Sequence, residues 1–387
     1  MAKSPEAGTL EAESPEPESR EASSGVAGGL LVLGMHRSGT SALMGALERL
    51  GLRLGEPLMG AQPGNPRGYF EHLSFYRLHQ EILDRFGHTW DDLRTFDPER
   101  LDPKRVEDCA AELAERVEEH FGDGLPWAIK DPRMCRLLPL WRTALKSLGS
   151  EPRYLIAFRH PDEVVASLAR RDGFSRDKAD LLWADHLLAA ERGSRGGRRA
   201  FLAFDRLLAD PLGSLDRVSQ QLGLAWPRQL ESAREEIDGF LESSLRHHAA
   251  PAGVPEPRGW LQDLVPSLYA SVLEAQENPE SLEDGGGLDA FSESAAERLD
   301  ALPQALLLEH ASQLHIDERR AMRHLIERGN EARQRTLEHQ QREIERLREL
   351  CTSLENRLHR RTEWLKNQDE LIHDLGARLE RLEDGEP

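Results

Sequence analysis

Four short apolar runs, separated by longer segments of helical periodicity, set the predicted layout of the first 250 residues. The runs lie at 29–34, 127–129, 154–158 and 201–204. Between them, residues 106–120 and 163–171 show the spacing of amphipathic helices. Because strands that alternate with helices favour a parallel sheet covered on both faces, we predict an α/β domain over residues 28–250.

The last third of the chain shows a different pattern. Over 306–386 the composition is helical, and from Leu337 to Leu382 apolar residues recur at alternating steps of three and four. This seam is too narrow to serve a lone helix, so it predicts a coiled coil over 337–382. The simplest partner is a second copy in a parallel homodimer, with Cys351 on the seam. A helix that folds back on the domain is the alternative.

Two acidic segments flank the predicted domain. The formal net charge is −19, and most of it comes from residues 1–27 and 251–302. Residues 1–27 lack apolar periodicity and are predicted to be a disordered tail. Residues 251–305 are predicted to be an acidic linker with one short helix near 264–274. The domain between them is close to neutral, and the overall charge gives no support to nucleic-acid binding.

The sequence predicts a cytoplasmic protein without a membrane span. No run reaches the roughly 18 apolar residues that span a bilayer, and the N-terminus lacks the apolar centre of a signal peptide. The three cysteines, Cys109, Cys135 and Cys351, form no CxxC pair and no cluster with histidine at metal spacing. We therefore expect reduced thiols and no metal site.

The loop after the first apolar run carries the first candidate chemistry. Residues 34–41 read Gly-Met-His-Arg-Ser-Gly-Thr-Ser between a predicted strand and a predicted helix, where backbone N–H groups can cradle a phosphate. Thr40 stands where the GxxxxGK[ST] loop of nucleotide triphosphatases has its lysine, so the loop is poorly equipped for ATP or GTP hydrolysis. Arg37 offers a cation instead. An ordinary strand–helix turn is the alternative.

A second pair of residues suggests another anion site. Arg159 directly follows the run at 154–158, and Ser167 lies eight residues later on the following helix. Both can reach the crevice at the carboxyl ends of the strands, where ligands of parallel sheets bind. Two phosphate-binding sites at one edge of the sheet predict a ligand with two separated phosphates.

These motifs resemble those of the sulfotransferase superfamily, whose donor is 3′-phosphoadenylyl sulfate (PAPS). Residues 37–41 match the family's 5′-phosphosulfate loop, and Arg159 with Ser167 matches its Arg-x7-Ser pair for the 3′-phosphate. Residues 129–133 are similar to a Lys-Asp-Pro stretch of tyrosylprotein and related bacterial sulfotransferases, and residues 65–71 to a segment of the bacterial branch. The resemblance covers about residues 28–250.

The resemblance implies a P-loop-type sheet, no metal and a defined set of site residues. Arg37 and Lys130 would stabilise charge on the leaving phosphate, as sulfuryl transfer requires. The donor would be held by Arg37, Ser38, Gly39, Thr40, Ser41, Arg159 and Ser167.

The residue that removes the acceptor proton is open. The histidine of the cytosolic small-molecule branch is absent from the Lys130-Asp131-Pro132 stretch, which favours a carboxylate. Glu71 and Glu56 are the candidates, with Glu71 preferred because it closes a motif. His72, His36 and Asp131 stay possible, and Arg246, His247 and His248 could close over the nucleotide.

The sequence thus predicts a PAPS-dependent sulfotransferase that acts on an acceptor hydroxyl, with carbohydrate as the preferred acceptor class. A P-loop nucleotide or sugar kinase is the first alternative, and Thr40 counts against it. A coiled-coil scaffold with an inactive nucleotide-binding domain is the second.

Overall fold

The computed structural model describes most of the chain between residues 29 and 376. The described ranges are 29–61, 65, 67–94, 96–97, 100–241, 253–256, 263–282, 287–300 and, with gaps at 335, 339, 350, 357 and 364, 333–376. The chain divides into two units, Met1–His310 and Ala311–Pro387. The predicted tail at 1–27 lies outside the described residues.

A sheet of four parallel strands lies at the centre of the first unit, in the order β2-β1-β3-β4. The strands are β1 (Leu30–Leu33), β2 (Ala128–Lys130), β3 (Arg153–Phe158) and β4 (Arg199–Ala203). Each overlaps one of the four apolar runs, so the predicted parallel sheet is confirmed. Every strand residue except Arg153 is buried, which explains why the strands are continuous apolar runs and do not alternate.

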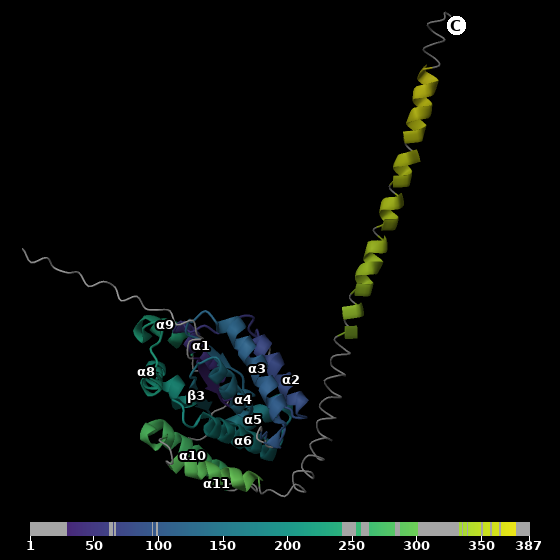
Figure 1. Ribbon diagram of the computed structural model, residues 1–387. Coiled ribbons are helices and arrows are strands. Elements are labelled where there is room, and N and C mark those ends of the chain that lie inside the picture. Colours follow the sequence, from purple (N-terminus) through teal and green to yellow (C-terminus); the bar gives the residue numbers. More distant parts are fainter. Residues whose placement is uncertain are drawn as a thin grey trace, which may run out of the picture. The chain divides into compact units, whose positions relative to one another are not determined.

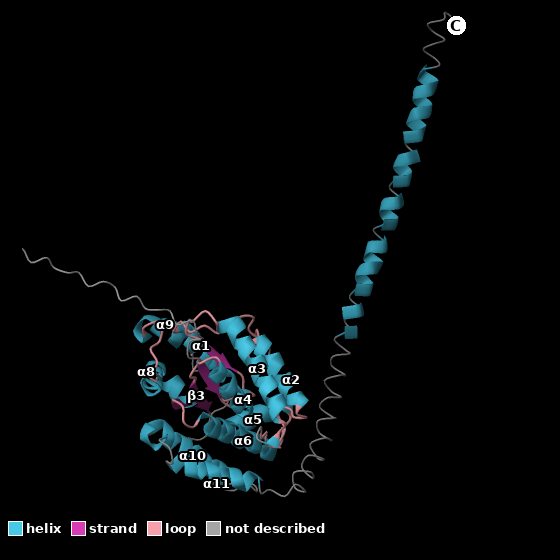
Figure 2. Cartoon of the chain, in the orientation of Figure 1, coloured by secondary structure: helices cyan, strands magenta, loops and turns pink. Residues whose placement is uncertain are grey.

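Helices cover both faces of this sheet (Figures 1 and 2). They are α1 (Thr40–Arg49), α2 (Leu73–Arg85), α3 (Pro103–Phe121), α4 (Met134–Ser147), α5 (Pro161–Asp172), α6 (Arg176–Ser194), α7 (Phe204–Ala209), α8 (Pro211–Leu222), α9 (Leu230–Phe240), α10 (Leu264–Glu277) and α11 (Gly287–Asp300), with a short 3₁₀ helix, η3 (Pro279–Leu282).

Successive strand residues point to opposite faces and build two separate cores. Leu31 and Leu33 of β1 pack in the larger core, with residues of α2 to α6 and of α10. Leu30 and Val32 pack in the smaller core, with residues of α1, α8 and α9. This double covering fixes the strand ends, and therefore the loops that leave them.

The strand order places a crevice beside the end of β1. After β1 the chain adds β2 on one side and then β3 and β4 on the other. The loops that leave neighbouring strands therefore diverge, and ligands of parallel sheets bind at such a switch point. The loop 34–39, Lys130 and Arg159 all lie at carboxyl ends of these strands.

The packed part of the first unit continues beyond residue 250. The short helix expected near 264–274 is present as α10, but Leu268, Tyr269 and Val272 are buried in the larger core and do not belong to a solvated linker. α11 packs beside it and against α6. An acidic residue of α11 contributes to this packing: Asp289 accepts a hydrogen bond from the buried Arg199 of β4 at 2.6 Å.

The second unit contains a long helical stretch. Its described residues from 336 to 376 are helical, which agrees with the predicted helix. The apolar seam is exposed: Leu347 and Leu354 are about half accessible, and Leu358 is 69% accessible. The coiled coil itself involves a partner and stays a prediction. Residues 301–332 and 377–387, with Leu379 and Leu382 of the seam, lie outside the described residues.

None of the helices in the described part of the chain is both long enough and apolar enough to cross a membrane.

Candidate functional site

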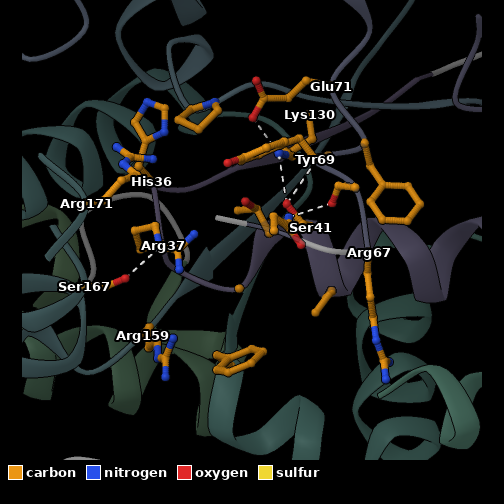
Figure 3. A pocket seen from close by; sticks show the side chains of 18 of the residues that line it. His36, Arg37, Ser41, Arg67, Tyr69, Glu71, Lys130, Arg159, Ser167 and Arg171 are labelled. Atoms are coloured by element: carbon orange, nitrogen blue, oxygen red, sulfur yellow. Dashed lines mark hydrogen bonds and ion pairs between the residues drawn. The ribbon is translucent and has the colours of Figure 1, made fainter. Parts of the chain in front are cut away.

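A cavity of about 360 Å³ opens at the carboxyl ends of the strands (Figure 3). Its walls come from the loop after β1, the segment before α2, the ends of β2 and β3, and the start of α7. The lining residues are His36, Arg37, Gly39, Thr40, Ser41, Ala42, Asn65, Arg67, Gly68, Tyr69, Phe70, Glu71, Lys130, Pro132, Arg159, Ser167, Arg171, Phe204 and Phe240. Nearly all predicted site residues therefore share one cavity, although they lie far apart in the sequence.

The phosphate-type loop enters α1 through two residues with positive φ. Gly39, the N-cap of α1, has φ 84°, and a Cβ there would stand 2.2 Å from the ring of Phe204. Only glycine fits this turn. Arg37 has φ 70°, a left-handed conformation that is strained for a residue with a side chain. The first turn of α1 carries no acidic residue, so its N–H groups favour an anion in the cavity.

One end of the cavity gathers three arginines and a serine. The Nε atom of Arg37 donates a hydrogen bond to Ser167 Oγ at 2.7 Å, which joins the loop after β1 to α5. Arg159 lies beside them, between β3 and α5, and pairs with the buried Glu163 in the first turn of α5. Burial and the nearby charge of Arg171 lower the pKa of the Arg37 guanidinium. This concentration of positive charge is suited to a phosphate group.

The other end holds a buried ion pair. Lys130 Nζ lies 2.8 Å from Glu71 Oε1 and 3.4 Å from Ser41 Oγ, and the Lys130 and Glu71 side chains are at most 5% accessible. Ser41 in turn donates to the carbonyl of Tyr69 at 3.1 Å. Figure 3 shows the Lys130 amine and the Glu71 carboxylate pointing toward each other. A cation, a hydroxyl and a carboxylate thus meet at one point.

The segment before α2 aims Glu71 into the cavity. Phe70 has φ 55° and, with Arg37, is one of two non-glycine residues with positive φ in the described chain. Its ring lies edge-on to Phe240 of α9, with 5.9 Å between centroids. His72 then caps α2 by accepting a hydrogen bond from the N–H of Ser74 at 3.3 Å. A strained residue and a helix cap therefore fix the carboxylate between them.

The remaining predicted residues lie elsewhere. Ser38 is buried within the loop and does not line the cavity, and Glu56 is exposed and does not line it either. Of the other proposed bases, His36 lines the cavity, and burial lowers its pKa well below the usual value. His72 and Asp131 are buried outside the lining. Residues 246–248 lie outside the described residues.

Some lining residues, among them Arg171 and Phe204, carry no motif in the sequence. Arg171 lies four residues after Ser167 on α5, so the helical period places both on one face, and this spacing could have revealed it. Phe204 opens α7 directly after β4, and the Arg159 guanidinium lies 4.8 Å from the centre of its ring. No local pattern marks Phe204 as a site residue, since the strand residues before it, 200–203, are also buried and apolar.

The cavity is electropositive. Five of its lining residues are arginine or lysine, and Glu71 is the one carboxylate among them. Negative ligands are therefore favoured. In the part of the chain that the structure describes, no group of three or more His, Cys, Asp or Glu side chains is arranged to hold a metal ion.

Comparisons with known proteins give only distant structural similarity. No protein-family model matches the chain, and no curated protein matches it significantly. Among solved structures, the sulfotransferase domain of the olefin synthase from Synechococcus PCC 7002 is 16% identical and aligns with 63% of this chain and 94% of its own, with a TM-score of 0.36.

Two further solved structures are also sulfotransferases. The sulfotransferase domain from the curacin biosynthetic pathway is 14% identical over 72% of this chain and 100% of its own, with a TM-score of 0.33. Mouse sulfotransferase SULT7A1, solved in complex with PAP, is 16% identical over 58% of this chain and 68% of its own, with a TM-score of 0.29. At these values the similarity assigns no activity to this chain.

Proposed function

We propose that this chain is a sulfotransferase that moves a sulfuryl group from 3′-phosphoadenylyl sulfate to an acceptor hydroxyl. The observation that carries the proposal is the shared cavity, which has an arginine-rich end at Arg37, Arg159 and Ser167 and a Lys130–Glu71 pair at the other. Two separated anionic groups on one ligand match this arrangement. The volume lies within the usual range for small-molecule sites, about 300–1,000 Å³.

The residues present fit the donor. The N–H groups at the start of α1, with Thr40 and Ser41, would hold the 5′-phosphosulfate, and Arg159 with Ser167 would hold the 3′-phosphate. The hydrogen bond from Arg37 to Ser167 supports a role for Arg37 in holding both the 5′-phosphosulfate and the 3′-phosphate, because Ser167 belongs to the residues proposed for the 3′-phosphate. Phe204 offers an aromatic wall beside Arg159.

The Lys130–Glu71 pair can perform the transfer. Glu71 would accept the proton of the acceptor hydroxyl while the acceptor oxygen forms a bond to sulfur. The bond between sulfur and the 5′-phosphate oxygen breaks, and Lys130 would stabilise the charge that develops on that oxygen. The products are the sulfated acceptor and adenosine 3′,5′-bisphosphate. Lys130 must then exchange its contact with Glu71 for the leaving phosphate.

Binding of adenosine 3′,5′-bisphosphate tests the proposal against both alternatives. We expect the bisphosphate to bind without Mg²⁺ and to be displaced weakly by ATP. A P-loop kinase would prefer ATP with Mg²⁺, and an inactive scaffold would bind the bisphosphate without transferring label from ³⁵S-labelled donor. Absence of bisphosphate binding at millimolar concentration would contradict the proposal.

We further propose carbohydrate hydroxyls as the acceptor class. The support is the resemblance of residues 65–71 to the bacterial branch, together with the position of this segment in the cavity wall, where Glu71 pairs with Lys130. Labelled donor incubated with fractionated polysaccharides, lipids and peptides from the source cell would identify the acceptor. Transfer of label only to peptides or lipids would contradict the carbohydrate class.

The exposed seam supports a second copy of this chain as partner. Leu347, Leu354 and Leu358 lie on one stripe of the helix and are half or more accessible. In a parallel pair, Glu343 of one helix would stand opposite Arg348 of the other at the flanking positions of the seam, which is an attractive contact. We propose a parallel homodimer.

A further inference from the structure

A chain of buried hydrogen bonds lies directly behind Lys130. Asp131, the next residue, accepts a hydrogen bond at Oδ2 from His79 Nδ1 of α2 at 3.0 Å. The indole Nε1 of Trp141 on α4 donates to His79 Nε2, also at 3.0 Å. Asp131, His79 and Trp141 are each at most 1% accessible. Their polar atoms therefore depend on one another for hydrogen bonding.

The chemistry of these groups fixes the direction of the chain. A tryptophan indole can only donate, so His79 Nε2 must accept and carries no proton in this arrangement. The proton of the imidazole is then on Nδ1, which donates it to Asp131. Trp141 thus selects the form of His79 that can hold the carboxylate.

The second oxygen of Asp131 is also held. Oδ1 accepts from the backbone N–H of Arg133 at 2.8 Å and from its guanidinium at 2.9 Å. The guanidinium lies 4.4 Å from the centre of the Tyr76 ring, one turn before His79 on α2. Burial would raise the pKa of Asp131, but the charge of Arg133 and the contact with His79 outweigh it and hold that pKa well below its usual range.

Helix α2 and the segment before it therefore reach two consecutive residues at the end of β2. Glu71, just before α2, pairs with Lys130, and His79, on its second turn, binds Asp131. The first contact must change during the proposed reaction, because Lys130 has to turn toward the leaving phosphate. The second does not involve Lys130 and can persist.

We propose that His79 is a positioning residue, which through Asp131 keeps the segment carrying Glu71 docked on the end of β2 while Lys130 exchanges partners. This inference rests on the proposed sulfuryl transfer and adds a residue that touches neither donor nor acceptor. The His79–Asp131 hydrogen bond keeps a buried polar link between α2 and the end of β2 when Lys130 turns away, at the moment when proton removal requires Glu71 to stay in place.

Two substitutions of His79 separate this role from simple packing. In His79→Asn the amide nitrogen stands near the position of Nδ1 and can still donate to Asp131, whereas in His79→Gln the amide lies near the position of Nε2 and meets Trp141 instead. The probe is single-turnover release of ³⁵S-sulfate from bound donor to water, which needs no identified acceptor. Binding of adenosine 3′,5′-bisphosphate is measured in parallel.

We expect His79→Gln to slow release by at least about tenfold while bisphosphate affinity stays within about twofold of the unsubstituted chain. His79→Asn should recover most of the rate, even if both variants unfold at similarly lowered temperatures. If His79→Gln does not fold, Trp141→Phe serves instead: it removes the donor to Nε2, leaves a smaller aromatic ring in the core, and should slow release with unchanged bisphosphate affinity.

Release at the normal rate in folded His79→Gln, or equal loss of rate in both His79 variants, would overturn the positioning role alone. An unsubstituted chain that neither binds the bisphosphate nor releases sulfate would overturn the proposed function as well, so the two failures are distinguishable.

Discussion

Arg37 and Ser167 are 130 positions apart in the sequence, yet the guanidinium of Arg37 donates a 2.7 Å hydrogen bond to the hydroxyl of Ser167. From the sequence alone, Arg37 and Ser167 are predicted to belong to two separate anion sites. Their contact makes the two sites continuous, with Arg37 between the loop and α5. A substitution in one of the two anion sites should therefore also change ligand binding at the other.

Arg159 is expected to contribute most to recognition of the 3′-phosphate. Its replacement by glutamine should weaken binding of adenosine 3′,5′-bisphosphate by about 1.5–3 kcal/mol, because a charge-assisted hydrogen bond is lost. Binding of adenosine 5′-phosphosulfate, which has no 3′-phosphate, should change little. Calorimetry with both nucleotides measures the difference.

The control for Arg159 addresses its buried partner. Arg159→Gln leaves the Glu163 carboxylate, which is 1% accessible, without this cation. The double variant Arg159→Gln/Glu163→Gln removes both charges and should recover stability but not bisphosphate affinity. Equal affinity of the unsubstituted chain for nucleotides with and without the 3′-phosphate would refute the assignment.

Glu71 is expected to act in transfer and not in donor binding. Glu71→Gln should lower turnover by about 10²–10⁴-fold, the usual contribution of a general base, while bisphosphate affinity stays near that of the unsubstituted chain. Glu56→Gln is the matched control, because Glu56 is exposed and outside the cavity lining. Normal turnover of Glu71→Gln together with loss in Glu56→Gln would identify Glu56 as the base.

The position of α10 predicts where the first unit can be cut. A chain ending near residue 260 should fail to fold stably, because it loses Leu268, Tyr269 and Val272 from the core, and a fully buried large apolar side chain contributes about 1.5–3 kcal/mol. A chain ending at residue 310 should fold and bind the bisphosphate. Circular dichroism melting of the two chains provides the comparison, and a cooperative transition in the shorter one would contradict this packing.

Cys351 offers a direct test of the helix pair. In a parallel, in-register dimer, two Cys351 side chains would face each other across the seam, so mild oxidation should trap a covalent dimer. Cys109 and Cys135 are buried and should not react. Non-reducing electrophoresis of the full chain and of Cys351→Ser measures the link. Sedimentation of the full chain as a monomer at tens of micromolar would refute the dimer.

His186 should make the first unit sensitive to mild acid. It is completely buried on α6 and donates from Nδ1 to the carbonyl of Leu182, and burial together with the charge of Arg136 lowers its pKa from 6.5 to about 4. The unfolded chain therefore binds this proton more readily than the folded chain. Its contribution is present above about pH 6.5 and is lost as the pH falls toward 4.

The magnitude of this effect can be measured by urea unfolding. Between pH 7 and pH 5 we expect a loss of about 2 kcal/mol from His186. His186→Phe removes the titrating group and should show a correspondingly smaller loss over the same range. An identical pH dependence in the two chains would show that other groups are responsible.

The sheet could be predicted from the sequence because each strand is buried on both faces and so appears as an uninterrupted apolar run. The phosphate-type turn could also be predicted, because its glycines and hydroxyl residues are contiguous in the sequence at 34–41. The Lys130–Glu71 pair could not be derived in this way, since it joins residues 59 positions apart and depends on where α2 begins.

The helices α10 and α11 show why composition alone is a poor guide to the boundary predicted at residue 250, since residues of both helices pack in the larger core. The acidic composition of the segment predicts a solvated linker, but Asp289 accepts a hydrogen bond from Arg199 of β4, and Arg199 also contacts the buried Glu191 at 2.8 Å. Asp289 of α11 and Glu191 of α6 therefore share in compensating the positive charge that Arg199 buries at β4. Pairing between distant segments, and not net charge, decides which helices pack.

The left-handed backbone at Arg37 and Phe70 carries a consequence for how this chain can change. Each such residue costs roughly 1–2 kcal/mol relative to an unstrained one, and both line the cavity. A screen for heat resistance alone would favour glycine at position 37. Glycine relieves the backbone strain and so raises the free energy of unfolding, but it removes the guanidinium. Selection for durability and selection for activity would thus pull this position in opposite directions, so thermostable variants should be screened for ligand binding at the same time.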